Sequence, residues 1–219
     1  MIENKPNMSF DIREMKAELG VLSNSDGSAL FSQGHTTVVV SVNGPVEVKL
    51  QNLSVEKASI EVYYRVKSGL SSVDDRFKEN FIQQCIETAL YSELHPRTAY
   101  KIQLQEIEDR GGLLACAINT TCLALLNSGL EQKFMFAAVY CVINSDGEIV
   151  MDPNLCAYEK PTATLTFVFD SLKGKAIAVH TIGKFTMENY QRAMDLCRSS
   201  SEKVFNFYRD IVNKVSVAL

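Results

Sequence analysis

Four basic side chains lie close together in the sequence, on either side of a short polar loop. Arg65 and Lys67 end a stretch in which apolar and polar residues alternate, and Arg76 and Lys78 follow the loop where a helix is expected to start. If the loop folds back, these four cations would lie in one region and could hold a phosphate backbone without reading its bases. The alternative is an ordinary solvated face with scattered Lys and Arg, and the sequence leaves both open.

A second feature with chemical potential is the turn Asp109-Arg110-Gly111-Gly112, which precedes an apolar segment. Glycines that open a helix let backbone N–H groups approach an anion, and the helix dipole adds to the attraction. Arg110 is a further candidate for contact with RNA phosphates. Leu113 and Leu114 follow directly, and their apolar side chains would close the approach to the turn. A plain phosphate- or nucleotide-binding module at this turn is therefore a weaker hypothesis.

Other chemistries find little support in the residue types. The six cysteines include no C-x-x-C pair and the three histidines lie far apart, so no metal site is predicted and the cysteines are expected to be reduced and buried. No G-x-S-x-G motif marks a nucleophilic serine. The net charge of −4 argues against a general nucleic-acid binder, so any RNA contact must be local. No signal-peptide pattern and no apolar run of about 18 residues occurs, so export and membrane insertion are not expected.

The elements that must position these residues follow from periodicity. Residues 15–48 alternate strand and turn signals and predict three antiparallel strands, and 58–66 alternates with period two, as a half-buried strand does. A helix is expected from a cap at Asp74 or Asp75 to about Leu94, because apolar residues recur there at intervals of three and four.

The second half of the chain alternates in the same way between strands and helices. A core helix over about 112–128 is apolar on nearly every side and ends before Gly129, and a long amphipathic C-terminal helix begins near Thr186. Strands are expected over 98–108, 134–143, 148–151, 162–170 and 176–182. The whole chain, 1–219, is thus expected to be one α+β domain with βα units, after a short N-terminal extension of about ten residues.

Three segments together resemble the RNase PH-like superfamily. They are SNSDGSALFSQGHTTVVVSVNGP near the start, LHPRTAYKIQLQEIEDRGGLLACAINTTCLAL in the middle, and SDGEIVMDP further on. The match spans almost the whole chain and implies the RNase PH-like fold with a mixed sheet. The L-H-P-R-T stretch and the ending Val204-Phe205-Asn206-Phe207-Tyr208-Arg209 are also similar to the small ring subunits of the eukaryotic RNA exosome, component-five type.

This resemblance implies partners. It implies other RNase PH-like subunits as paired neighbours in a ring of six, an S1/KH-type cap protein on one face, and RNA held weakly in the ring channel, whose mouth the four cations would line. It also implies a location in the nucleus, including the nucleolus, and in the cytoplasm. Because ring contacts bury on the order of 800 Å² per partner, we expect the isolated chain to self-associate as a homodimer.

The resemblance further implies what an active site would need. Active members hold phosphate through G-G-T-R at the start of the core helix, and they use an arginine on the first helix and two aspartates beyond the strand at 148–151. The matching positions here are Leu113 and Leu114 at the turn, Gln83 or Gln84 on the first helix, and Tyr158 and Thr164 beyond the strand.

Three parts of the expected site are thus missing together. We therefore expect a non-catalytic structural subunit, without cofactor or metal, that supports 3′-to-5′ RNA processing and degradation. The alternative is a stand-alone, weak metal-dependent nuclease that acts as a homodimer.

Overall fold

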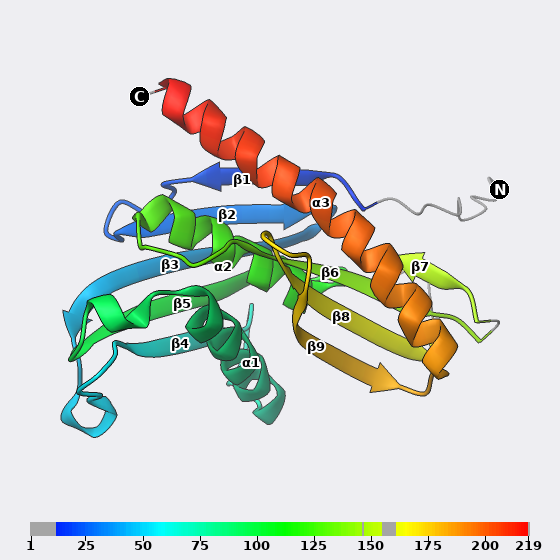
Figure 1. Cartoon of the computed structure of the whole chain (residues 1–219), viewed down its shortest axis with the longest axis horizontal. Helices are drawn as coiled ribbons and strands as arrows, with labels where there is room; N and C mark the ends of the chain where they lie inside the picture. Colours follow the sequence, from blue (N-terminus) through cyan, green and yellow to red (C-terminus); the bar gives the residue numbers. More distant parts are fainter. Residues whose placement is uncertain (1–11, 146, 155–160, 219) are drawn as a thin grey trace.

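The computed structural model describes residues 12–145, 147–154 and 161–218, which form two β-sheets and three α-helices (Figure 1). The larger sheet holds five strands in the order β1-β2-β3-β5-β4. Neighbouring strands are antiparallel except β4 and β5, which are parallel, so the predicted mixed sheet is confirmed. Its strands are β1 (Met15–Leu19), β2 (Gly27–Gln33), β3 (Thr36–Glu47), β4 (Ser59–Arg65) and β5 (Thr98–Glu108).

The two faces of this sheet differ because successive side chains on a strand point to opposite sides. Val42, Ile102 and Val62, which follow one another across β3, β5 and β4, are all buried against the helices. On the opposite face, Gln103 and Tyr63 are paired neighbours, and both are exposed. None of the three described α-helices packs against that side, which we call the open face.

Helix α1 (Val73–Ala89) packs on β4. The predicted cap at Asp74 or Asp75 is wrong by two or three residues, because Ser72 caps the helix. The Ser72 hydroxyl accepts the Asp75 N–H, and the Asp75 carboxylate accepts the Ser72 N–H in return, which forms a capping box. The predicted end at Leu94 is also too late. Leu90 leaves the helix to bridge Gln132, and a short 3₁₀-helix, η2 (Ser92–Leu94), follows.

Helix α2 (Leu113–Ser128) confirms the predicted core helix and packs against strands of both sheets. Gly112 and Gly129 bound it, each in the left-handed conformation that favours glycine. Gly27 on β2 lies against the same helix, where an added Cβ would come within 2.5 Å of the Ala124 carbonyl oxygen. The absence of a side chain at Gly27 therefore lets the helix approach the sheet closely.

The second sheet has four antiparallel strands in the order β7-β6-β8-β9. Helix α3 (Met187–Ala218) runs across β6 and then past β1, so it ties the two sheets together (Figure 1). Within the described part of the chain, no helix is long and apolar enough to cross a membrane. The strands are β6 (Phe136–Ile143), β7 (Ile149–Met151), β8 (Ala163–Asp170) and β9 (Ala176–Gly183).

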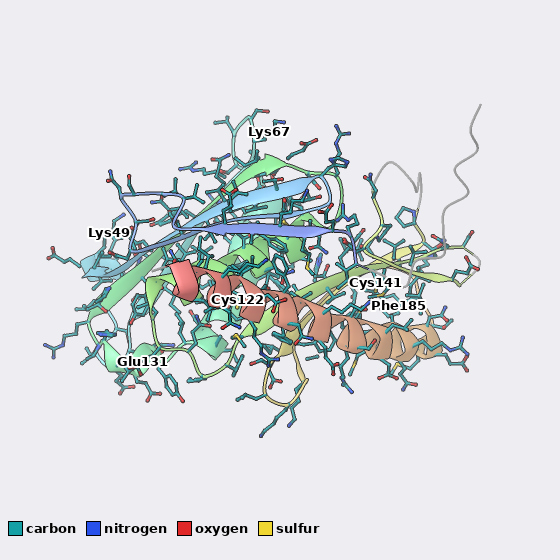
Figure 2. The ribbon with its side chains drawn as sticks, turned by 90° about the horizontal axis from the view of Figure 1, so that it is seen from above. Lys49, Lys67, Cys122, Glu131, Cys141 and Phe185 are labelled. Atoms are coloured by element: carbon teal, nitrogen blue, oxygen red, sulfur yellow. The ribbon has the colours of Figure 1, made fainter. Side chains whose placement is uncertain are left out.

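The predicted burial of the cysteines is confirmed for five of them. Cys85, Cys116, Cys122, Cys141 and Cys197 are buried free thiols, and Cys156 lies outside the described residues. In Figure 2 the label of Cys122 overlies α3 and that of Cys141 stands beside α3, both away from the outer edge of the molecule. Burial raises the pKa of the Cys85 and Cys122 thiols to about 12, so both stay protonated and behave as small apolar side chains.

Candidate functional site

The N-terminal end of α2 opens onto a cavity of about 410 Å³. Its walls come from the start of α1, the turn at Gly111 and Gly112, and the strands β8 and β9. Four of the residues singled out from the sequence meet here, although they are spread over almost 90 positions: Lys78, Leu113, Leu114 and Thr164. We refer to this hollow as the α2 cavity.

The Gly111–Gly112 turn and the first residues of α2 form the floor of the α2 cavity and bring no charged side chain to it. Leu113 is buried in the core, and Leu114 is half-buried and packs against it. Gly112 lacks a side chain and makes no side-chain cap for the helix. Only the backbone N–H groups and the helix dipole remain, and these alone attract anions weakly.

Charged groups around the α2 cavity make it less suitable for phosphate. Asp74 and Asp109 both line it, and Lys78 is the cation among the lining residues. The Lys78 ammonium lies 3.2 Å from the Asp75 carboxylate and 4.8 Å from the centre of the Tyr64 ring. Its positive charge is therefore already paired with a carboxylate and an aromatic ring of the protein. Two carboxylates facing one engaged ammonium would repel a pair of phosphate groups.

Aromatic rings form the wall of the α2 cavity between α1 and β9. The His180 ring lies 4.9 Å from Phe77 and 6.0 Å from Phe81, measured between ring centres. Burial lowers the pKa of His180, so its imidazole is neutral at pH 7 and adds no positive charge. Burial also raises the pKa of Tyr140 to about 12, so its hydroxyl stays protonated. This wall therefore adds no positive charge that could hold an anion in the cavity.

The remaining predicted site positions lie elsewhere. Gln83 and Gln84 on α1 do not line the α2 cavity, because the helix presents Phe77 and Lys78 to it instead. Gln83 donates to Glu87 at 2.9 Å and lines a separate hollow beside β4. Tyr158, the other expected metal-site position, lies outside the described residues. Among the described residues, no group of three or more His, Cys, Asp or Glu side chains is arranged to hold a metal ion.

The structure also separates the predicted RNA-contact cations. Arg65 lies on the open face of the sheet, in a hollow with Lys49 and Lys101, whereas Lys78 lines the α2 cavity. Arg110 donates to the Glu108 carboxylate at 3.0 Å, and the positive charge of Lys67 also acts on that carboxylate. Arg76 is exposed on the first turn of α1. Two of the four cations around the polar loop, Arg65 and Lys78, therefore line different hollows.

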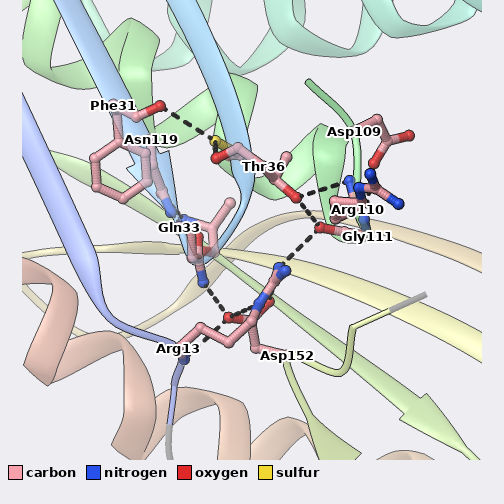
Figure 3. Close-up of polar contacts among 11 residues, drawn as sticks. Arg13, Phe31, Gln33, Thr36, Asp109, Arg110, Gly111, Asn119 and Asp152 are labelled. Atoms are coloured by element: carbon pink, nitrogen blue, oxygen red, sulfur yellow. Dashed lines mark hydrogen bonds and ion pairs between the residues drawn. The ribbon is translucent and has the colours of Figure 1, made fainter. Parts of the chain in front are cut away.

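Behind the same glycine turn lies a polar cluster that the sequence alone did not reveal (Figure 3). Asp152 follows β7 and is 2% exposed. The Arg13 guanidinium donates to both of its carboxylate oxygens, at 2.9 and 2.6 Å, and Gln33 donates to it at 2.7 Å. Arg13 also donates to the Gly111 carbonyl at 2.8 Å. This Arg13–Asp152 cluster therefore joins the N-terminal segment, the glycine turn and the second sheet.

In the sequence, Asp152 stands at a strand end before Pro153, and no pattern assigns it a partner. Asp152 has φ of 45°, in the left-handed region that Asn and Asp tolerate better than most residues. Its partner Arg13 stands 139 positions away, and no local pattern links the two. The one feature of the sequence that could have pointed to this buried cluster is an aspartate that ends a strand among apolar neighbours.

Comparisons with known proteins agree with this fold. The RNase PH model, described as 3′ exoribonuclease family, domain 1, matches residues 11–131. The chain is 32% identical to the "Exosome complex component RRP46 homolog" of Caenorhabditis elegans, over 94% of this chain and 97% of the relative. It is 33% identical to the "Exosome complex exonuclease RRP46 homolog" of Arabidopsis thaliana, over 72% of this chain and 66% of the relative.

Solved structures show the same arrangement. The crystal structure of rice (Oryza sativa) Rrp46 superimposes with a TM-score of 0.86 at 28% identity, covering 91% of this chain and 94% of the other. The Archaeoglobus fulgidus exosome with RNA bound to the active site superimposes with a TM-score of 0.80 at 17% identity, covering 91% of this chain and 89% of the other. At 17% identity this second likeness concerns the fold alone.

Proposed function

Because the chain belongs to the RNase PH family of 3′ exoribonucleases, we propose that it is a non-catalytic ring subunit of an RNA exosome core. It supports 3′-to-5′ RNA processing and degradation by completing the ring rather than by cleaving RNA. The relatives of similar length carry exosome names, and the names divide between "component" and "exonuclease", so the catalytic state must come from the site itself.

The observation that carries the non-catalytic part of the proposal is the lining of the α2 cavity. Phosphorolysis brings an attacking phosphate next to a scissile phosphodiester, so the site must hold two anions with preorganised donors or cations. At the helix end this cavity offers Leu113 and Leu114, and its carboxylates, Asp74 and Asp109, outnumber its cation. Removal of one such donor typically slows an enzyme by about 10²–10³, and several are replaced here.

The proposed partners follow from the ring. They are other RNase PH-like subunits as paired neighbours and an S1/KH-type cap protein, in the nucleus, including the nucleolus, and in the cytoplasm.

Exposed apolar side chains at the start of α1, Leu70 at 96% and Val73 at 83%, are suited to a contact with a ring neighbour. In isolation the chain is expected to self-associate through this surface. Lys67, Arg76 and Arg110 would then meet RNA weakly at the channel mouth.

The test is to purify the chain and give it labelled single-stranded RNA with inorganic phosphate and Mg²⁺, then to repeat the reaction without phosphate. We expect no release of nucleoside diphosphates in either reaction, and restored RNA degradation when the chain is added to a ring that lacks this subunit. Phosphate-dependent release of nucleoside diphosphates by the chain alone would overturn the proposal. Metal-dependent cleavage without phosphate would instead identify a stand-alone nuclease.

A further inference from the structure

The open face of the five-stranded sheet carries a hollow of about 350 Å³ that is separate from the α2 cavity. Lys49, Tyr63, Arg65, Lys101 and Gln103 line it, and none of them lines the α2 cavity. Figure 2 shows Lys49 at the outer edge of the molecule, away from the buried Cys122. The hollow is therefore a second surface with its own chemistry.

The strand register places these side chains in a regular order. Lys101 on β5 is the pairing neighbour of Glu61 on β4, and Gln103 is the neighbour of Tyr63. Arg65 stands two residues beyond Tyr63 on the same strand and so points to the same side of the sheet. At about 3.3 Å per residue, Arg65 lies about 13 Å along the strand from the level of Lys101. The aromatic ring and the amide thus lie midway between two cationic ends.

The three cations are not held in ion pairs with the described carboxylates. Within the described part of the chain, no carboxylate lies within ion-pair distance of Lys49, Arg65 or Lys101. The nearby acid, Glu61, is 8% exposed. It is bound by the Asn52 amide at 2.8 Å and by the Tyr63 hydroxyl at 3.0 Å.

The pKa of Glu61 is lowered, first by the Asn52 hydrogen bond against the effect of burial, and then by Tyr63, Lys101 and Lys49. The Glu61 carboxylate therefore stays ionised while the cationic side chains still face solvent.

Tyr63 is the aromatic group of this surface. It is 38% exposed, and its hydroxyl bond to Glu61 ties the ring to the sheet. A fixed and exposed ring with cations on both sides is the arrangement by which β-sheet proteins bind single-stranded nucleic acid, with bases on the ring and phosphates on the cations. Gln103 beside the ring can hydrogen-bond to a base edge.

We propose that the open face across β4 and β5 binds a short stretch of single-stranded RNA. Phosphates contact Lys49, Lys101 and Arg65, and one base stacks on Tyr63. The choice of RNA as ligand rests on the proposed exosome function, while the site itself rests on the geometry of this face. The site lies on the opposite side of the sheet from the helices, so RNA held here does not occupy the α2 cavity.

The test measures binding of a fluorescent oligouridine to the full chain at several salt concentrations. Lys49→Glu/Lys101→Glu/Arg65→Glu is compared with Lys173→Glu/Lys175→Glu/Lys184→Glu, which makes the same charge change at exposed positions around β9. The first variant should bind at least tenfold more weakly than the second. The dependence of log K on log salt should also fall by about 2, as expected for three lost contacts with a single strand.

A second pair of variants tests the stacking. Tyr63→Leu should weaken binding roughly tenfold, whereas Tyr63→Phe keeps the ring and should restore most of the affinity. If a charge variant fails to fold, crosslinking of 4-thiouridine RNA to the unaltered chain shows where the RNA binds. Crosslinks on residues 59–65 and 98–105 support the site, and crosslinks confined to the α2 cavity overturn it.

Two other outcomes would also overturn the inference. One is an equal loss of affinity in the two charge variants. The other is displacement of RNA by polyglutamate together with no effect of Tyr63→Leu, since this face would then serve an acidic polypeptide. Neither result would bear on the proposal that the α2 cavity is non-catalytic. Conversely, release of nucleoside diphosphates would overturn the proposed function and leave this RNA site in place.

Discussion

The two sides of the Gly111–Gly112 turn have opposite characters. On one side the Arg13–Asp152 cluster buries an ion pair with hydrogen bonds from Gln33 and to Gly111. On the other side the α2 cavity is open to solvent, with leucines at the helix end and carboxylates on its rim. The buried polar contacts therefore lie on the side of the turn that holds the two sheets together. The difference indicates that the polar groups behind this turn stabilise the fold.

The largest effect should come from breaking the buried pair. Arg13→Met leaves Asp152 buried without its counter-charge, and loss of one partner of such a pair typically costs about 3–5 kcal/mol. Chemical denaturation measures the free energy of unfolding. Lys16→Met on β1 is the matched control, because Lys16 is exposed and its change should stay within about 0.5 kcal/mol. Equal losses in the two variants would mean that the cluster does not hold the sheets together.

The free energy of unfolding of Arg13→Met should also depend on pH differently from that of the unaltered chain. Burial raises the pKa of Asp152, against the opposing effects of Arg13 and Gln33, and removal of Arg13 should raise it further. A carboxyl whose pKa is raised by folding binds its proton more readily in the folded state, so a fall in pH favours folding. The stability gap between Arg13→Met and the unaltered chain should therefore narrow from pH 7 to pH 5. A gap that widens would contradict the burial of the Asp152 charge.

A smaller effect is expected at the turn that both regions share. Gly112→Ala places a methyl group at φ of 69°, within 3.2 Å of Asp152 and 3.3 Å of both Arg13 and Tyr140. We expect a loss of about 2 kcal/mol or more from backbone and crowding together. Gly129→Ala is the control, since its φ is 71° but nothing lies within 4 Å, so it should lose only about 1 kcal/mol. Thermal unfolding of both variants would show whether the cluster crowds the turn.

The smallest effect concerns the affinity of the α2 cavity for phosphate. Leu114→Arg introduces a guanidinium at the α2 cavity and should tighten binding of inorganic phosphate roughly tenfold, as expected for one charge-assisted hydrogen bond. Calorimetric titration with phosphate measures this change. Gln83→Arg adds the same charge on α1 but outside the cavity, so it should leave the affinity unchanged. Phosphorolysis should appear in neither variant, because Asp74 and Asp109 still face the cavity. Equal gains in phosphate affinity in the two variants would mean that phosphate does not bind in the α2 cavity.

The sequence by itself determined the elements and much of the fold class. Apolar residues that recur with helical or strand period predict which segments are buried, and α2, β5 and the long C-terminal helix occur within a few residues of their expected bounds. The cap of α1 was misplaced because Ser72 and Asp75 both have capping side chains, and only the backbone geometry shows which one is the cap. The sequence also determined that Leu113 and Leu114 stand at the helix start, since a residue type does not depend on folding.

Only the tertiary structure decided which of these residues meet. It brought Lys78 and Thr164 to one cavity, turned Gln83 away from it, and placed Arg65 on the open face with Lys101. It also joined Arg13 to Asp152 across 139 positions. The physical reason is that local periodicity records which side of an element is buried. Contacts between distant elements depend on how the sheets and helices pack, and no short stretch of sequence contains that information.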